Sequence, residues 1–176
     1  AEQGRVTDGR ALLLAIVLGV DVSTSIGNAV TTGLKFFRPA TAGGFGATAA
    51  VAAIAGPDRE TLLDAFGLYY AQAGGTMQAH TEGLALLAMQ AGFCARDAVV
   101  AVRMAEQGIP GTRGTLEGPF GYLRLMEDDY DRDALLGGLG TVWRITEVAH
   151  KPFPSGRATH GLLDGLSTLL AEHGFS

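Results

Sequence analysis

The sequence predicts a mainly α fold: a helical bundle domain with one or two short strands near its C-terminal end. Apolar residues recur at helical spacing in several long segments, and Gly or Pro separates those segments. Only residues 143–148 alternate apolar and polar side chains as a strand does. The chain has 176 residues, of which 47% are apolar and 18% charged, so its composition is globular and one domain is the default.

Two buried helices are expected in the first part of the chain. Thr7 or Asp8 can cap the first, which should end near residues 28–30. Its apolar stripe is wide and predicts burial on much of its surface: Leu12, Leu13, Ile16, Val17 and Val20. Pro39 suits the start of the second helix, at 40–55, which is almost entirely small and apolar. Such a helix belongs in the centre of a bundle, because its length and polar flanks do not fit a membrane span.

Four further helical segments are expected, over 58–73, 90–107, 134–139 and 159–173. Asp58 can cap the first of them, and Gly74-Gly75 can end it. Residues 76–88 indicate a turn followed by helical or irregular chain. The strand expected at 143–148 has no evident pairing partner in the sequence, which indicates that its partner strands belong to another part of a longer protein.

Charge and cysteine content narrow the function classes. The net charge of −5 argues against a nucleic-acid partner. The apolar run from Ala11 to Val20 stops at Asp21, too short to span a bilayer, and no signal peptide pattern precedes it. Cys94 is the only cysteine, which excludes an internal disulfide and a cysteine-based metal site. We therefore expect a cytoplasmic protein without a membrane partner, a metal or another cofactor.

The densest group of reactive side chains lies between Lys151 and His160. Pro152 and Pro154 keep the backbone extended, and Arg157 adds a second cation just before the last helix. Ser155 or Thr159 is the expected N-cap, and a helix N-terminus with nearby cations favours a carboxylate or phosphate. The alternative is a proline-stiffened connection whose cations lie in solvent, and these residues alone slightly favour that alternative.

Other polar groups favour structural roles. His80 and Glu82 lack further ligands at metal-binding spacing, so a solvated turn is expected. The acidic residues from Asp128 to Asp133 lack the glycine and terminal glutamate of a calcium loop, so they should form an exposed loop and a helix cap. Cys94 lies on an apolar helix and should be a buried, inert thiol.

The sequence resembles the MmgE/PrpD family, which includes 2-methylcitrate dehydratases, cis-aconitate decarboxylases and an iminodisuccinate epimerase. Four segments bear the resemblance in order: FFRPATAGGFGATAA at 36–50, AFGLYYAQAGG at 65–75, MQAGF at 89–93 through AEQG at 105–108 and LEGPFG at 116–121, and WRI at 143–145 followed by KPFP at 151–154 and His160. The resemblance covers about residues 10–170. It implies a partial chain from the middle of the family's length, with a helical domain at 1–142 and the passage into a lid domain at 143–176.

The resemblance also implies a chemistry. Family members act on small polycarboxylates without a metal, by removing or moving a proton next to a carboxylate. Lys151 stands at the active-site lysine of the Lys-Pro-(Tyr/Phe)-Pro signature, and His160 matches the histidine that follows it, so both are the candidate catalytic residues. Arg38 and Arg157 are the candidate substrate-binding residues, because guanidinium groups bind carboxylates bidentately.

Several positions depart from the family pattern. Arg38 stands where a histidine is common, and Leu87 and Gln90 stand where a second lysine and its neighbouring histidine are expected. Three hypotheses follow: a lyase or isomerase-type domain of the family, a non-catalytic helical scaffold derived from it, or an unrelated helical carboxylate-binding domain. Uncovered apolar faces on the 11–30 and 40–55 helices also predict a homo-oligomer, such as a homodimer, or a complex with another chain.

Overall fold

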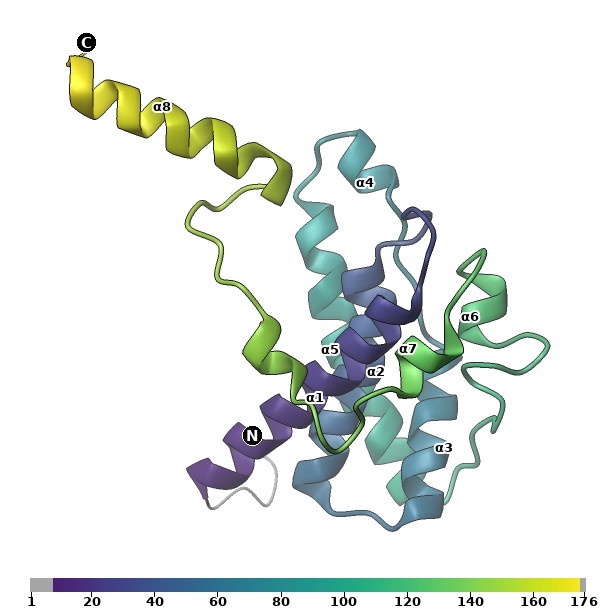
Figure 1. The fold of residues 1–176 in the computed structure, drawn as a ribbon. Helices are drawn as coiled ribbons and strands as arrows, with labels where there is room; N and C mark the ends of the chain where they lie inside the picture. The colour runs from purple at the N-terminus through teal and green to yellow at the C-terminus, as the bar shows by residue number, and fades with distance from the viewer. Residues whose placement is uncertain (1–7, 175–176) are drawn as a thin grey trace. The chain divides into compact units, whose positions relative to one another are not determined.

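Helix α2 (Arg38–Ala55) lies at the centre of the first part of the chain in the computed structural model, which describes residues 8–174. Helices α1 (Gly9–Ala29), α3 (Arg59–Tyr70) and α5 (Leu86–Glu106) pack against it (Figure 1). Pro39 occupies its first turn, and Gly56 in the left-handed conformation ends it, with its N–H bonded to the Ala52 carbonyl. The prediction of a central helix made of small residues is confirmed.

Small residues let α1 and α2 approach each other closely. A Cβ added at Gly19 would lie 2.8 Å from the Gly46 carbonyl oxygen and 3.0 Å from the Ala50 Cβ. A Cβ at Gly44 would collide with the ring of Tyr69, which is fully buried beneath α2. These glycines leave room for a neighbouring helix backbone at one contact and for an aromatic ring at the other. The close packing that results compensates for the low helix propensity of glycine.

The remaining helices of this part are short: α4 (Gln78–Thr81), α6 (Tyr122–Leu125) and α7 (Arg132–Leu136). Asp8 caps α1 through the Arg10 N–H, Asp58 caps α3 through the Thr61 N–H, and Asp131 caps α7 through two N–H groups. The alternative cap Thr7 lies outside the described residues. The expected role of the acidic cluster as loop and helix cap is thus confirmed at Asp131.

The strand expected at 143–148 is wrong. Residues Arg144–Glu147 form a 3-10 turn, η1, and no sheet forms among residues 8–174; the only bridges described are the isolated pairs Val30–Tyr130 and Phe36–Thr76. Local bonds satisfy this backbone, because the Thr146 N–H and hydroxyl both reach the Trp143 carbonyl. The Arg144 N–H donates to the buried Asp21 carboxylate at 3.2 Å. A segment without a strand partner takes such local bonds instead.

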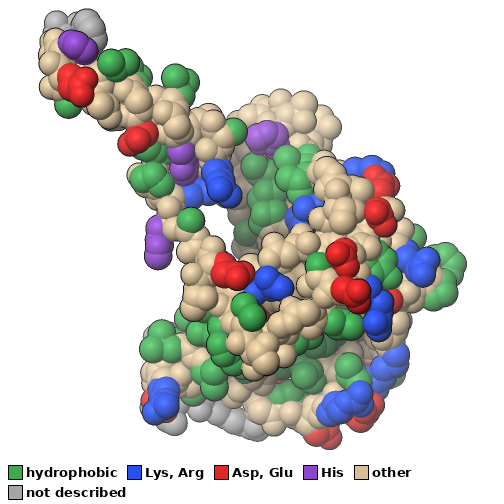
Figure 2. Space-filling view, viewed as in Figure 1, with side chains coloured by type: hydrophobic (Ala, Val, Ile, Leu, Met, Phe, Trp, Pro, Cys, Tyr) green, Lys and Arg blue, Asp and Glu red, His purple; other side chains and the backbone are tan. Residues whose placement is uncertain are grey.

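The chain divides into two compact units, residues 1–146 and 147–176. The first has its own core, with Tyr69, Tyr122, Phe45 and Leu123 among its largest fully buried side chains. The second contains the 3-10 turn η2 (Arg157–Thr159) and α8 (His160–His173), and α8 has no buried residue. Hydrophobic side chains are visible along α8 in Figure 2. The interpretation of 143–176 as the start of a lid remains a prediction.

By length and composition, α1 is the one described helix that could cross a membrane. It is longer than the apolar run read from the sequence, because it continues through Asp21 to Ala29. Asp21 and Ser25 on this helix are buried, and the helix packs along α2. These contacts are typical of a helix in a bundle core. The predicted buried stripe is wrong, however, because Leu12, Leu13 and Ile16 are exposed, and small residues such as Ala15 and Gly19 form the buried face that meets α2. The absence of a membrane partner remains a prediction.

Candidate functional site

Lys151 and His160 contact the same backbone oxygen. The Lys151 Nζ donates to the Ser155 carbonyl at 3.2 Å, and the His160 Nε2 lies 3.3 Å from that oxygen. The turn between them, shaped by Pro152 and Pro154, folds the chain back so that residues nine positions apart meet. The two side chains therefore lie close together at the start of the last helix, while their catalytic roles remain predictions.

Hydroxyl groups fix the far side of this turn. The Ser155 and Thr159 hydroxyls lie 2.8 Å apart, and the Thr159 hydroxyl donates to the Gly156 carbonyl. Thr159 holds the N-cap position of α8 but makes no capping bond, so the predicted side-chain cap is wrong. The hydroxyl is committed to the 3-10 turn that precedes the helix, and this turn takes the place of the cap.

An aromatic ring and exposed cations surround the Lys151 and His160 side chains. The Phe153 and His160 rings pack in a T-shaped contact, with their centres 5.6 Å apart. Lys151 and Arg157 are exposed, and His160 is partly buried. An ammonium group and an imidazole beside one another can bind an anion and exchange a proton with it. Arg157 lies on η2 and supplies a further cation on the same short segment.

Arg38, in the other unit, forms a buried ion pair. Its Nε and Nη2 donate to the two carboxylate oxygens of Glu127, each at 3.0 Å, and Nη2 also donates to the Thr32 carbonyl at 3.2 Å. The side chains are 19% and 3% exposed. This fork geometry is the bidentate arrangement that the sequence suggested for a substrate carboxylate, but here an internal carboxylate occupies it. The substrate-binding role of Arg38 remains a prediction.

A chain of hydrogen bonds continues from Glu127 into the core. The Tyr122 hydroxyl donates to Glu127 at 2.7 Å and lies 3.1 Å from the Thr41 hydroxyl. The Tyr69 hydroxyl donates to the carbonyls of Ala40 and Thr41. Burial raises the pKa of Tyr122 and of Tyr69 above the usual range of a tyrosine. Both phenols therefore remain neutral donors, and the network fixes the start of α2.

Glu127 is a residue that the sequence did not single out. It precedes the exposed acidic residues Asp128 and Asp129, and it lies 89 positions from its partner Arg38. A polar segment gives no local sign that one of its carboxylates turns inward. The available signal was Arg38 itself: a cation at the start of a buried helix needs an acidic partner, and a search for that partner could have pointed to Glu127.

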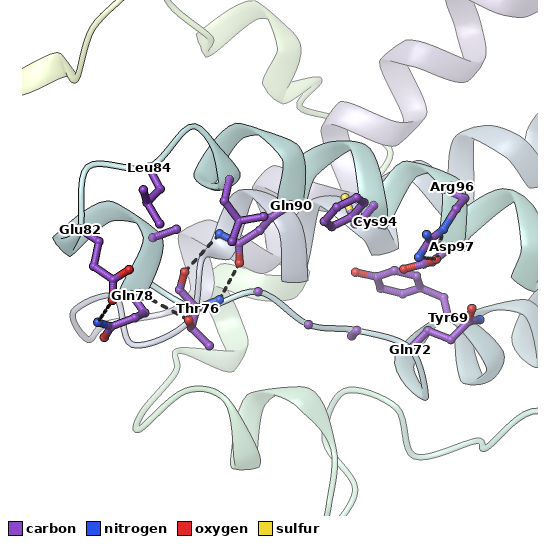
Figure 3. Close-up of a pocket in the computed structure, with 16 residues that line it drawn as sticks. Tyr69, Gln72, Thr76, Gln78, Glu82, Leu84, Gln90, Cys94, Arg96 and Asp97 are labelled. Carbon is purple, nitrogen blue, oxygen red and sulfur yellow. Dashed lines mark hydrogen bonds and ion pairs between the residues drawn. The ribbon is translucent and has the colours of Figure 1, made fainter.

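A cavity of about 430 Å³ lies in the unit of residues 1–146, between α3, α4 and α5. Figure 3 shows Gln78 and Glu82 at one end and Arg96, Asp97 and Gln72 at the other. The position where a family histidine was expected, Gln90, is in its wall. The Gln90 amide accepts the Thr76 N–H at 2.7 Å and donates to the Thr76 carbonyl, so it clamps the backbone. Leu87, the other departing position, does not line the cavity.

Cys94 lies in the same wall, and burial raises the pKa of its thiol. Its Sγ contacts the Ala91 carbonyl, so the expectation of a buried, unreactive thiol is consistent with its surroundings. Within residues 8–174, no three His, Cys, Asp or Glu side chains gather closely enough to hold a metal ion. That the reaction proceeds without a metal ion remains a prediction.

Comparison with known proteins agrees with the resemblance seen in the sequence. The family model described as MmgE/PrpD N-terminal domain matches residues 1–134. A cis-aconitate decarboxylase of Aspergillus terreus is 27% identical over 98% of this chain and 37% of its own length. A second cis-aconitate decarboxylase, from Aspergillus terreus strain NIH 2624 / FGSC A1156, is 27% identical over 96% of this chain and 36% of its own length.

The chain thus spans a little over a third of the length of these curated relatives. The family match includes all of α1, α2, α3 and α5, the helices that build the core. It overturns the hypothesis of an unrelated helical carboxylate-binding domain, because three quarters of the chain fits one family's domain. This chain belongs to the MmgE/PrpD family.

Proposed function

We propose that this chain is part of a lyase that acts on a small di- or tricarboxylate, by proton abstraction and elimination of the 2-methylcitrate dehydratase type. The observation that supports this most directly is the meeting of Lys151 and His160 at the Ser155 carbonyl, on a segment that resembles the family's active-site signature. Family membership and the two relatives named as decarboxylases of a tricarboxylate support the substrate class.

The chemistry needs a base and a cation at one place. Removing a proton next to a carboxylate pushes negative charge into that carboxylate, and nearby cations stabilise it. Lys151 and His160 can divide these tasks, with one group accepting the proton while the other, charged, holds the anion. Arg157 binds a second carboxylate of the substrate in this proposal. Arg38 keeps its proposed role as a substrate-binding residue, although its Nε and Nη2 already donate to Glu127 and Thr32.

The test is a turnover assay with a charge-matched control. Loss of 2-methylcitrate and of cis-aconitate is followed by proton NMR, which separates dehydration from decarboxylation by the product formed. We expect Lys151→Ala to lower the rate by about 100-fold or more, as for loss of a general acid or base. Lys35→Ala removes the only other lysine, which makes an exposed ion pair with Asp128, and should retain the rate. Equal rates for wild type and Lys151→Ala would remove Lys151 from the mechanism.

The second candidate is a non-catalytic scaffold derived from the same family. Two observations favour it: an internal carboxylate already occupies Arg38, and α8 beside the Lys151 turn has no buried residue. The assay separates the candidates, because a scaffold predicts that wild-type protein turns over none of the polycarboxylates. Cytoplasmic location and association into a homo-oligomer or a complex with another chain belong to this proposal in either form, and size-exclusion chromatography with light scattering tests the association.

A further inference from the structure

The cavity between α3, α4 and α5 has the construction of a ligand site. Its volume of about 430 Å³ is within the range of small-molecule pockets, roughly 300–1,000 Å³. The backbone from Gly74 to Thr76 lines it on one side, held there by the Gln90 amide. A Cβ at Gly74 would meet no atom closer than 3.9 Å, so Gly74 itself faces open space, whereas a Cβ at Gly75 would lie 2.8 Å from the Gln90 amide oxygen.

Apolar side chains form part of the cavity wall. Leu84, Leu86 and Phe93 line it, and each has more than 40% of its surface exposed. Ala73, Ala79 and Cys94 add small apolar surface. Apolar side chains that remain accessible around a cavity gain free energy when a ligand covers them, at roughly 25 cal/mol for each Å² removed from water. The body of a suitable ligand is therefore hydrocarbon.

The charged groups of the cavity leave a net negative charge. The lining contains three of them, Glu82, Arg96 and Asp97. The Arg96 guanidinium pairs with Asp97 at 2.6 Å and stacks over the Phe93 ring, 5.5 Å from its centre, so its charge is balanced. The Glu82 carboxylate accepts only a neutral donor among the bonds described, the Gln78 amide at 2.6 Å. A carboxylate can accept several donors, so Glu82 has room for another.

One departure from the family pattern points the same way. The resemblance expects a histidine at Gln90, which lines the cavity and is uncharged here; the other departing position, Leu87, lies outside the lining. Gln90 uses its amide to hold Thr76 rather than to present a charge to the cavity. No cation remains in the lining to neutralise a carboxylate that entered, and Glu82 would repel it.

We propose that this cavity binds a small organic cation, an amine with a hydrocarbon body, whose ammonium group pairs with Glu82. All of its lining residues lie in the unit of residues 1–146, so the site uses no residue of the Lys151 turn. The cavity thus selects the opposite charge from the polycarboxylates proposed for Lys151 and His160. Its ligand is a modulator or a second reactant of amine class.

The test uses three probes that share one body: 4-phenylbutylamine, 4-phenylbutanol and 4-phenylbutyrate. Binding to the whole protein is measured by calorimetry and by NMR shifts of the backbone amides. We expect the amine to bind about tenfold more tightly than the alcohol, as one charge pair at a partly enclosed site allows, with the carboxylate weakest. Shifts should gather at Gly74 to Thr76 and along α5.

Matched variants separate charge from shape. Glu82→Gln should remove the preference for amine over alcohol, and Glu60→Gln, at an exposed glutamate outside the cavity, should leave it unchanged. Phe93→Ala should weaken all three probes, and Phe120→Ala, at an exposed phenylalanine outside the lining, should not. All four positions are at least partly exposed, so folding should be retained, and circular dichroism checks this.

Two results would overturn the proposal: equal or tighter binding of the alcohol or carboxylate, or an amine preference that persists in Glu82→Gln. Failure to bind any probe would also overturn it. None of these results bears on the lyase proposal, because binding is measured without turnover. Conversely, an inactive protein that binds the amine would reject the lyase and retain this site.

Discussion

Arg38 and Lys151 are both basic side chains that the sequence singled out, but they lie in contrasting surroundings. Arg38 belongs to a unit with a close-packed core, and its charge is paired with a carboxylate only 3% exposed. Lys151 belongs to a unit in which α8 buries nothing, and its described partner is a backbone carbonyl four residues away. Long-range packing fixes the first cation, and only local bonds hold the second.

The contrast separates two properties of a basic side chain: how firmly the fold holds it, and how available its charge is to a ligand. A cation neutralised inside a core helps to define one folded arrangement but offers little charge to a ligand. A cation on an exposed turn is accessible to a ligand, but local bonds alone hold its geometry and water reaches it. Catalysis of the kind proposed needs both properties in one place, so the exposed apolar face of α8 is where the proposed site still needs a covering surface.

The largest expected effect comes from breaking the Arg38 pair. Glu127→Ala should lower the free energy of unfolding by about 3 kcal/mol or more, because it leaves a largely buried guanidinium and the Tyr122 hydroxyl without their acceptor. Urea denaturation measures this. Glu60→Ala, which removes exposed pairs with Arg59 and Arg113, should cost at most about 1 kcal/mol. Similar losses at the two sites would mean that Arg38 is not held by the core.

Close helix packing gives the next effect. Gly46→Ala should destabilise the protein by about 1–3 kcal/mol, since its Cβ would collide with the Gly19 backbone. Gly43→Ala lies on the same helix with no atom within 4 Å of the added Cβ, and should stabilise by up to about 1 kcal/mol through helix propensity. Thermal unfolding distinguishes the opposite signs. If both variants behave alike, the α1–α2 contact is looser than described.

The smallest effect is expected in the second unit. Leu166→Ala should change the free energy of unfolding by less than about 0.5 kcal/mol, because this leucine is exposed on α8. Leu123→Ala removes the same groups from the buried core and should cost about 2–5 kcal/mol. A large loss at Leu166 in solution would show that another surface, such as a second copy, covers α8 there. The same variant examined by light scattering would then show altered association.

The sequence alone determined the helices of the core and the grouping of Lys151 with His160. These features depend on local rules: apolar spacing, Asp58 as a cap, Pro39 at a helix start, Gly56 at a helix end, and prolines that fold a short turn back on itself. The error at 143–148 has the same origin. Alternation predicts a strand, but a strand also needs a partner, and local bonds to Trp143 and Asp21 satisfied this backbone instead.

Only the tertiary structure decided how the polar groups are used. Glu127 looked like one more acidic residue of a loop until folding placed it against Arg38, 89 residues away. Gln90 looked like a lost histidine, and packing made it the clamp on Thr76 that lines a negatively charged cavity. Helix formation depends on neighbours within one turn of chain, whereas the pairing of buried charges and the lining of a cavity depend on segments brought together from far apart, and no local pattern records that meeting.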